Sequence, residues 1–184
     1  MDLLAFLRTQ VRANRLANHR LHAAMTALSH DDFHAPRASF FPSLALTLNH
    51  ILAVDIYYLA ALHGEPDMQA RWAAFQRCDT LGQLAPAQAR ADARFIALLD
   101  GLSPPQLDAV IDLDRGDHIQ RERRGNVIAH VLNHQVHHRG QVHAMLAGTA
   151  IIAPQLDEFL MPSEAHLRSA DMAALGWREN DLFR

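Results

Sequence analysis

Apolar residues recur along the first part of the chain with helical spacing. Over residues 2–29 they return every three or four positions, as in a helix stripe packed into a core. The stripe consists of Leu4, Leu7, Val11, Asn14, Asn18, Leu21, Met25 and Leu28. Buried amides need hydrogen-bond partners. Either a polar group faces Asn14 and Asn18 from inside the protein, or a slight rotation leaves them at the edge of the core.

Two other segments read as long helices from their apolar content and their ends. Residues 41–62 are apolar on nearly all sides, as expected of a helix surrounded by others, and Ser43 is placed to cap its start. Residues 125–148 form a further helix, and Gly148 is typical of the position just after a helix end.

Residues 80–99 complete the set of long helices. Thr80 and Gln83 have the spacing of a capping box at its start, and Pro86 either kinks the helix or marks a later start. Together the four segments predict an all-α fold, a four-helix bundle of antiparallel helices.

Between the third and fourth helices the pattern changes to alternation. Residues 109–114 and 118–123 alternate around an Arg115-Gly116 turn. This predicts a short hairpin.

The length of 184 residues is that of one domain over residues 1–184. We expect a core over about residues 2–160 and a C-terminal extension over residues 161–184. The C-terminal part has a turn at Ala153-Pro154 and a short helix after Ser163.

Composition describes an ordinary globular protein, with 49% hydrophobic and 20% charged residues. The formal net charge is −3, lysine is absent and the arginines are scattered, which argues against a nucleic-acid surface. Cys78 is the one cysteine, so no internal disulfide can form.

The location is predicted from two further features. Asp2 and Arg8 interrupt the N-terminal apolar residues too early for a signal peptide. The most apolar run, residues 40–62, contains polar and charged residues, which favours a buried helix over a membrane span. We therefore expect a soluble, cytoplasmic protein.

Candidate chemistry concentrates in the fourth helix. It contains His130, His134, His137, His138 and His143. Two imidazoles four residues apart can bind one metal ion with bonds of about 2.0–2.1 Å. His130 and His138 lie about 12 Å apart along the axis, so His130, His134 and His138 cannot all bind one ion. A metal would bind one adjacent pair, and its other ligands would come from another part of the chain.

The apolar stripe of this helix favours one pair. His134 and His138 occupy stripe positions, and an imidazole in a buried stripe needs a partner or a metal. His130 lies at the edge of the stripe, and His137 and His143 lie off it. These three are more typical of solvated residues or of residues that support a site from behind.

Several common sites are excluded by their motifs. The residues between His134 and His138 include no glutamate, so a zincin protease is disfavoured, as is a ferritin-like di-iron site. One cysteine cannot build a structural zinc site. Neither a phosphate-binding glycine loop nor a nucleophile elbow is present.

Four motifs of the chain resemble those of one protein family. The run H-x-x-x-H-x-x-x-H-R-G-Q at residues 130–141 resembles the fourth helix of the DinB (damage-inducible) family. LTLNHILAVD at residues 46–55 is similar to the family's second helix, with a histidine in its middle. RANRLANHRL at residues 12–21 and PQLDEF at residues 154–159 resemble its N-terminal and C-terminal motifs.

The resemblance implies a four-helix bundle with a single divalent metal. Its ligands would be one histidine of the second helix and the adjacent pair of the fourth, which here are His50, His134 and His138. Three nitrogen ligands leave a coordination position open, as in catalytic sites. Imidazole suits Zn, Ni and Fe alike, so the metal is left open.

The resemblance also sets the functional hypotheses. The first is a metalloenzyme, either a transferase or isomerase that uses a low-molecular-weight thiol or a metal-assisted hydrolase. The second is a non-enzymatic stress-response metal-binding protein, and the third is an interaction protein with incidental histidines. A small-molecule substrate and a homodimer are expected partners, without nucleic acid or membrane.

Other polar residues are candidates for supporting roles. Gln141 and Asp157 are expected to line the site, and Asn14 and Asn18 to lie behind its ligands. Arg139 serves either the structure or an anionic substrate.

Overall fold

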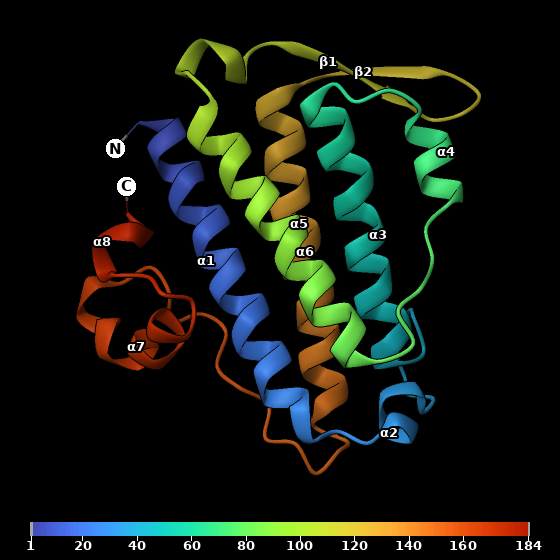
Figure 1. Cartoon of the computed structure of the whole chain (residues 1–184), viewed down its shortest axis with the longest axis vertical. Helices are drawn as coiled ribbons and strands as arrows, with labels where there is room; N and C mark the ends of the chain where they lie inside the picture. Colours follow the sequence, from blue (N-terminus) through green and yellow to red (C-terminus); the bar gives the residue numbers. More distant parts are fainter. Residues whose placement is uncertain (1, 184) are drawn as a thin grey trace.

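The computed structural model describes residues 2–183 and shows a mostly helical protein with a small two-stranded sheet (Figure 1). Four long helices lie side by side. They are α1 (Leu3–Ala24), α3 (Leu44–His63), α5 (Leu81–Gly101) and α6 (Arg124–Leu146). The four long helices predicted from the sequence are therefore present.

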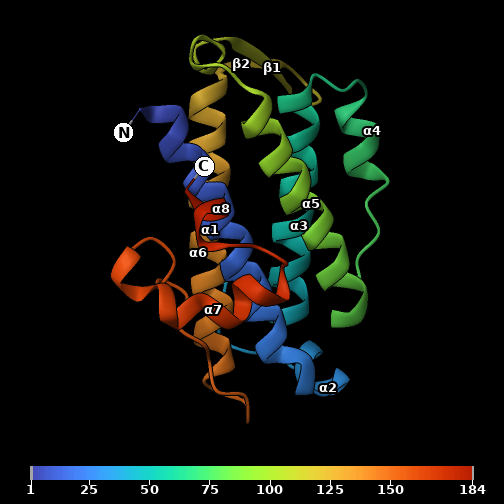
Figure 2. The same ribbon diagram turned by 60° about the vertical axis from the view of Figure 1, so that its left-hand side comes forward.

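The directions of these helices differ from the prediction. α1 packs against α5, and α3 against α6, with opposite directions. The neighbours α3 and α5, however, run the same way, as do α1 and α6 (Figures 1 and 2). The cause is the connection over residues 64–80, which contains α4 (Met68–Ala73) and returns the chain to the end where α3 began. The expectation that all four helices are antiparallel was wrong.

The predicted caps set the starts of α3 and α5. Ser43 Oγ accepts a hydrogen bond from the Leu46 amide at 3.1 Å. Thr80 and Gln83 form the reciprocal capping box at the start of α5. Pro86 lies inside α5, so the helix begins before the proline rather than after it.

The first helix ends earlier than residue 29. A 3-10 turn (Met25–Ala27) follows α1, and then the short helix α2 (His30–His34). Ser29 interrupts the helix because it caps α2: its backbone is extended and its Oγ accepts from the Asp32 amide at 3.0 Å.

The predicted hairpin is present. β1 (Val110–Asp114) pairs antiparallel with β2 (Ile119–Arg123), and a 3-10 turn (Pro104–Leu107) precedes them. Gly116 provides the positive φ of the turn, +91°, which residues with a side chain rarely adopt.

The C-terminal segment packs against α1 (Figure 2). It contains a 3-10 turn (Pro162–Glu164), α7 (Ala165–Ala174) and α8 (Glu179–Leu182), so the helix expected after Ser163 is confirmed. The turn expected at residues 153–154 was wrong; the turn lies at residues 158–159.

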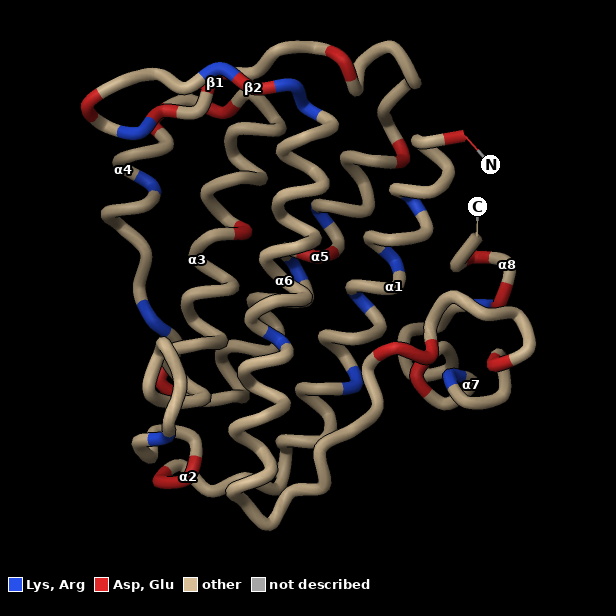
Figure 3. Tube along the Cα trace, turned by 180° about the vertical axis from the view of Figure 1, so that it is seen from behind, with Lys and Arg blue, Asp and Glu red and all other residues tan. Residues whose placement is uncertain are grey.

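The apolar helix α3 is buried by its neighbours. By length and composition it could span a membrane, with a mean hydropathy of 1.4, but 78% of that window is buried inside the protein. Asp55 is its one acidic residue, whereas charged residues gather on the hairpin and around α7 (Figure 3). α3 is thus a core helix of this fold.

The structure decides the question of the two asparagines in α1. Asn14 and Asn18 are 5% and 2% exposed and both accept hydrogen bonds from Arg139 Nη1, with 2.9 Å to Asn18 Oδ1. Arg139 is itself buried on α6 and also donates to Gln135 Oε1 at 3.3 Å. The interpretation of a polar group facing the asparagines is confirmed. Arg139 therefore holds the helices together.

Two carboxylates complete this buried polar network. Asp92 of α5 accepts from Asn18 Nδ2 at 3.0 Å, and Gln88 Nε2 donates to Asp55 at 2.6 Å and to Asp92 at 3.1 Å. Burial raises the pKa of Asp92 to about 6, and burial together with the Asp92 charge raises the pKa of Asp55 well above its usual value. Arg139 and Asp92 thus face each other as opposite charges within the network, and Asp92 also lies 3.6 Å from Arg15 Nη1.

Replacing Arg139 by Met should destabilise the protein by about 3–5 kcal/mol, because it leaves the buried oxygens of Asn14, Asn18 and Gln135 without their donor and Asp92 with Arg15 as its remaining nearby cation. Urea unfolding monitored by circular dichroism in the presence of a chelator measures this without any contribution from metal. The exposed Arg121→Met is the control and should change the free energy of unfolding by less than about 0.5 kcal/mol. Equal effects of the two substitutions would contradict the role given to Arg139.

Candidate metal centre

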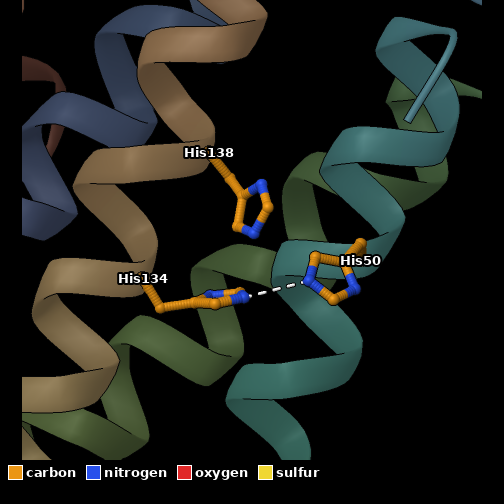
Figure 4. Close-up of side chains that lie close together, drawn as sticks. All are labelled: His50, His134 and His138. Atoms are coloured by element: carbon orange, nitrogen blue, oxygen red, sulfur yellow. Dashed lines mark hydrogen bonds between the residues drawn. The ribbon is translucent and has the colours of Figure 1, made fainter. Parts of the chain in front are cut away.

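Three histidines from two helices point toward a common space (Figure 4). His134 and His138 lie one turn apart on α6, and His50 lies on the facing helix α3. One nitrogen of each ring lies within 4.8 Å of a nitrogen of the other two. The structure thus brings together the three predicted ligands. Their role as ligands stays a prediction.

The spacing suits a shared ion. His134 Nε2 and His50 Nε2 are 3.0 Å apart, and the centroid of the His138 ring lies 4.4 Å from that of His134 and 4.6 Å from that of His50. Two nitrogens bound to one ion at about 2.0–2.1 Å stand roughly 2.9–3.4 Å apart. Without metal, one imidazole N–H donating to the other ring accounts for the same distance.

Neighbouring groups fix the rings. Gln141 Oε1 accepts from His138 Nδ1–H at 2.7 Å, which leaves His138 Nε2 free to bind an ion. The Phe41 ring stacks on His50 with 4.2 Å between centroids. His134 Nδ1 is buried and has no hydrogen-bond partner among residues 2–183, so the polar interactions of this ring are confined to the histidine cluster.

The cluster is neutral at pH 7. Burial, with the nearby His138, lowers the pKa of His50 to about 4, and burial with the other histidines lowers the pKa of His134 to about 3. The pKa of His138 is also lowered by burial. Metal ions bind neutral imidazole, so these rings are in the state that binding requires.

The cluster opens into a cavity of about 460 Å³. Aromatic, neutral polar and apolar side chains form most of its wall, together with one arginine. The lining residues are His50, Val54, Tyr57, Tyr58, Gln69, Trp72, Arg115, His130, His134 and His138. A small molecule entering this cavity reaches the three histidines.

The structure places the other candidate site residues in three different surroundings. Gln141 contacts His138, as expected of a site residue. Asp157 is exposed in the loop before α7 and does not line the cavity, so that prediction was wrong. Asn14 and Asn18 contact Arg139 in the core, so the structural role of Arg139 is the one observed.

The remaining histidines of α6 lie outside the cluster. His130 lines the cavity with its ring 5.1 Å from Tyr58 and 6.4 Å from His134. His137 is exposed, and His143 Nε2 lies 3.0 Å from the Pro154 carbonyl oxygen. A second group of potential ligands, His30, His34 and Asp79, is exposed on the surface.

Much of the cavity wall was not predicted from the sequence. Tyr57 and Tyr58 follow His50 and Val54 along one side of α3, and this helical spacing could have revealed them. Gln69, Trp72 and Arg115 come from α4 and the hairpin turn. Their approach depends on tertiary packing that no local pattern shows.

The family model for DinB matches residues 4–164. The chain belongs to the DinB family. A solved structure of a DinB-like protein from Bacillus cereus superposes with a TM-score of 0.60 at 15% identity, over 77% of this chain and 89% of that chain. At this identity the likeness shows the fold. No curated protein is significantly similar in sequence.

Metal content should distinguish the histidines of this DinB-family protein. His138→Ala should lose metal, whereas His130→Ala should retain it, because His130 stands outside the cluster. Loss of a ligand should weaken affinity by more than the roughly 10–100-fold typical of a residue behind the ligands, which is the effect expected for Gln141→Ala. Elemental analysis of the variants, reconstituted side by side, gives the result. Retention in His138→Ala with loss in His130→Ala would overturn the assignment.

Metal should be retained at lower pH than at a site of ordinary histidines. The pKa values of about 4 for His50 and about 3 for His134 lie below the usual 6.5, so protons compete with the metal only in stronger acid. Metal affinity falls as the pH drops through these lowered pKa values. Above them the imidazoles are neutral, and protons no longer compete with the metal. The pKa of His138 is lowered as well, so we expect equilibrium dialysis to show half release well below the usual histidine pKa of 6.5. Half release near the usual histidine pKa would contradict the neutral cluster.

Proposed function

We propose that this protein binds one divalent metal ion through His50, His134 and His138 and uses the remaining coordination position in catalysis. The observation that carries the proposal is the convergence of three neutral imidazoles at the wall of an open cavity. Zn, Ni and Fe all suit such ligands. We also propose that the four long helices form the four-helix bundle that the family resemblance implies.

We favour group transfer with a low-molecular-weight thiol over hydrolysis. A bound divalent ion would hold a thiol as thiolate, which needs no separate base for its activation. Activation of water is commonly assisted by a carboxylate, and no Asp or Glu lines the cavity in the described part of the chain.

The chain's own residues support this reaction in distinct ways. Gln141 fixes the His138 ring so that Nε2 faces the cavity. Tyr57, Tyr58 and Trp72 give the cavity an aromatic wall that excludes water around a bound molecule. His130, on the same wall, is placed to exchange a proton with an acceptor.

A non-enzymatic stress-response metal-binding protein is the alternative. Such a protein needs the three ligands and no space beside them, whereas here a cavity reaches the ligands. We also propose a cytoplasmic location and a homodimer. Exposed Leu3 and Phe6 on α1 offer apolar surface for a second copy.

The proposal is tested with cobalt-loaded protein. Mercaptoethanol should produce a thiolate-to-cobalt charge-transfer band, and the metal-loaded protein should transfer this thiol to an electrophilic aryl halide. Treatment with chelator should abolish transfer, and added metal should restore it.

Two variants serve as controls for this assay. His134→Ala should lack both the band and the activity. His63→Ala, an exposed histidine on the same helix as His50, should keep both. Stoichiometric metal without a thiolate band or turnover would leave the non-enzymatic alternative, and absence of metal would remove both functions.

A further inference from the structure

Arg115 introduces a positive charge into the cavity beside the histidines. Its guanidinium carbon lies 5.5 Å from the ring centroids of both Tyr57 and Tyr58. Nη2 donates to Tyr58 Oη at 3.1 Å, and Nε donates to Gln120 Oε1 at 2.9 Å. These partners are neutral, so the hydrogen bonds hold the guanidinium without balancing its charge.

Arg115 forms no ion pair with a carboxylate among residues 2–183. The nearest linked carboxylate is Glu122, which lines an adjoining cavity with Arg115 and accepts from Gln120 Nε2 at 2.8 Å. Apart from its histidines, Arg115 is the one ionisable basic or acidic side chain that lines the described cavity wall beside its two tyrosines.

The charge is also held in place. Tyr57 Oη and Gln69 Nε2 each donate to the Asp114 carbonyl oxygen at 2.5 Å, which ties the end of β1 to α3 and to α4. The next residue is Arg115. Its backbone is therefore fixed over the cavity before any ligand binds, which lowers the cost of ordering the side chain.

We propose that the cavity binds a small anionic molecule, with its carboxylate-like group at Arg115 and a metal-binding donor atom at the three histidines. This inference rests on the proposed metal site and names the class of substrate that it takes. A divalent ion held by neutral ligands would add to the positive charge of Arg115, and an anion compensates both in a partly enclosed space. A guanidinium has five N–H donors in a planar fork, which suits a carboxylate.

The dimensions agree with a ligand that bridges the two positions. Tyr58 and His130 lie between them: the Tyr58 ring is 5.1 Å from the His130 ring, which is 6.4 Å from the His134 ring. A chain or ring of a few atoms between the donor atom and the anionic group can lie along this wall. The aromatic surface favours an apolar middle section.

The test measures charge selectivity at the metal. Cobalt-loaded full-length protein is titrated with mercaptopropionate and with the neutral mercaptopropanol, and the thiolate-to-cobalt band reports binding. Mercaptopropionate should bind about tenfold or more tightly, as expected for a charge-assisted hydrogen bond. The ratio of the two dissociation constants is compared between proteins, so intrinsic differences between the thiols cancel.

Variants of the hairpin connect this selectivity with Arg115. Arg115→Gln should bring the ratio down at least severalfold with metal content unchanged, and Arg115→Lys should retain part of the preference because the charge remains. Arg121→Gln is the matched control: it removes an arginine of the same hairpin that is exposed and faces Asp112. If Arg115→Gln had the same ratio of dissociation constants for the two thiols as the wild-type protein, the inference would be overturned.

Wild-type protein gives a test that does not depend on the folding of any variant. The cationic mercaptopropylamine should bind more weakly than mercaptopropanol, and equal or tighter binding would overturn the inference. Metal present without charge selectivity would refute the anion site and leave the proposed function intact. Failure of wild-type protein to bind metal would refute both.

Discussion

The burial of Arg139 is the constraint on which the placement of α6 depends. Taking a guanidinium out of water costs several kcal/mol unless polar groups surround it. Here α1 supplies Asn14 and Asn18, and α5 supplies the Asp92 carboxylate. Only one rotation of α6 brings Arg139 to these partners. His134 and His138 each precede a member of the network, Gln135 or Arg139, by one residue, which is about 100° around the helix. The rotation that satisfies Arg139 therefore also turns the two histidines toward His50 on α3.

The crossover between α3 and α5 has a comparable effect on the cavity. Because residues 64–80 return the chain along the outside of the long helices, α4 lies beside α3 and contributes Gln69 and Trp72 to the wall. An immediate turn into an antiparallel helix would have left this side of α3 without that cover. The hairpin then closes over the same end of the molecule, where Tyr57 and Gln69 bind its backbone.

The sequence predicted the features that depend on neighbouring residues. Ser43 and Thr80 cap their helices as local rules require, and the hairpin turns at Gly116. Spacing together with the apolar stripe selected His134 and His138, whereas His50 came from the family resemblance, since one histidine within an apolar helix has no local pattern. The relative direction of α3 and α5 could not be predicted, because it depends on the path of a connection with no periodicity. Arg115 was missed for a similar reason: it is a turn residue whose importance comes from the helices beneath it.

The polar residues of the core and those of the cavity differ in charge balance. In the core, the charges of Arg139 and Arg15 are opposed by Asp92, and amide side chains surround them, while burial and the Asp92 charge raise the pKa of Asp55. In the cavity, neutral histidines and an arginine without a carboxylate leave a positive bias. Charges that are opposed within the protein stabilise the fold without a ligand, whereas an unopposed charge has lower free energy when a ligand supplies the opposite one. The difference in charge balance, more than the number of polar groups, marks the histidine cavity as the site where this molecule binds something else.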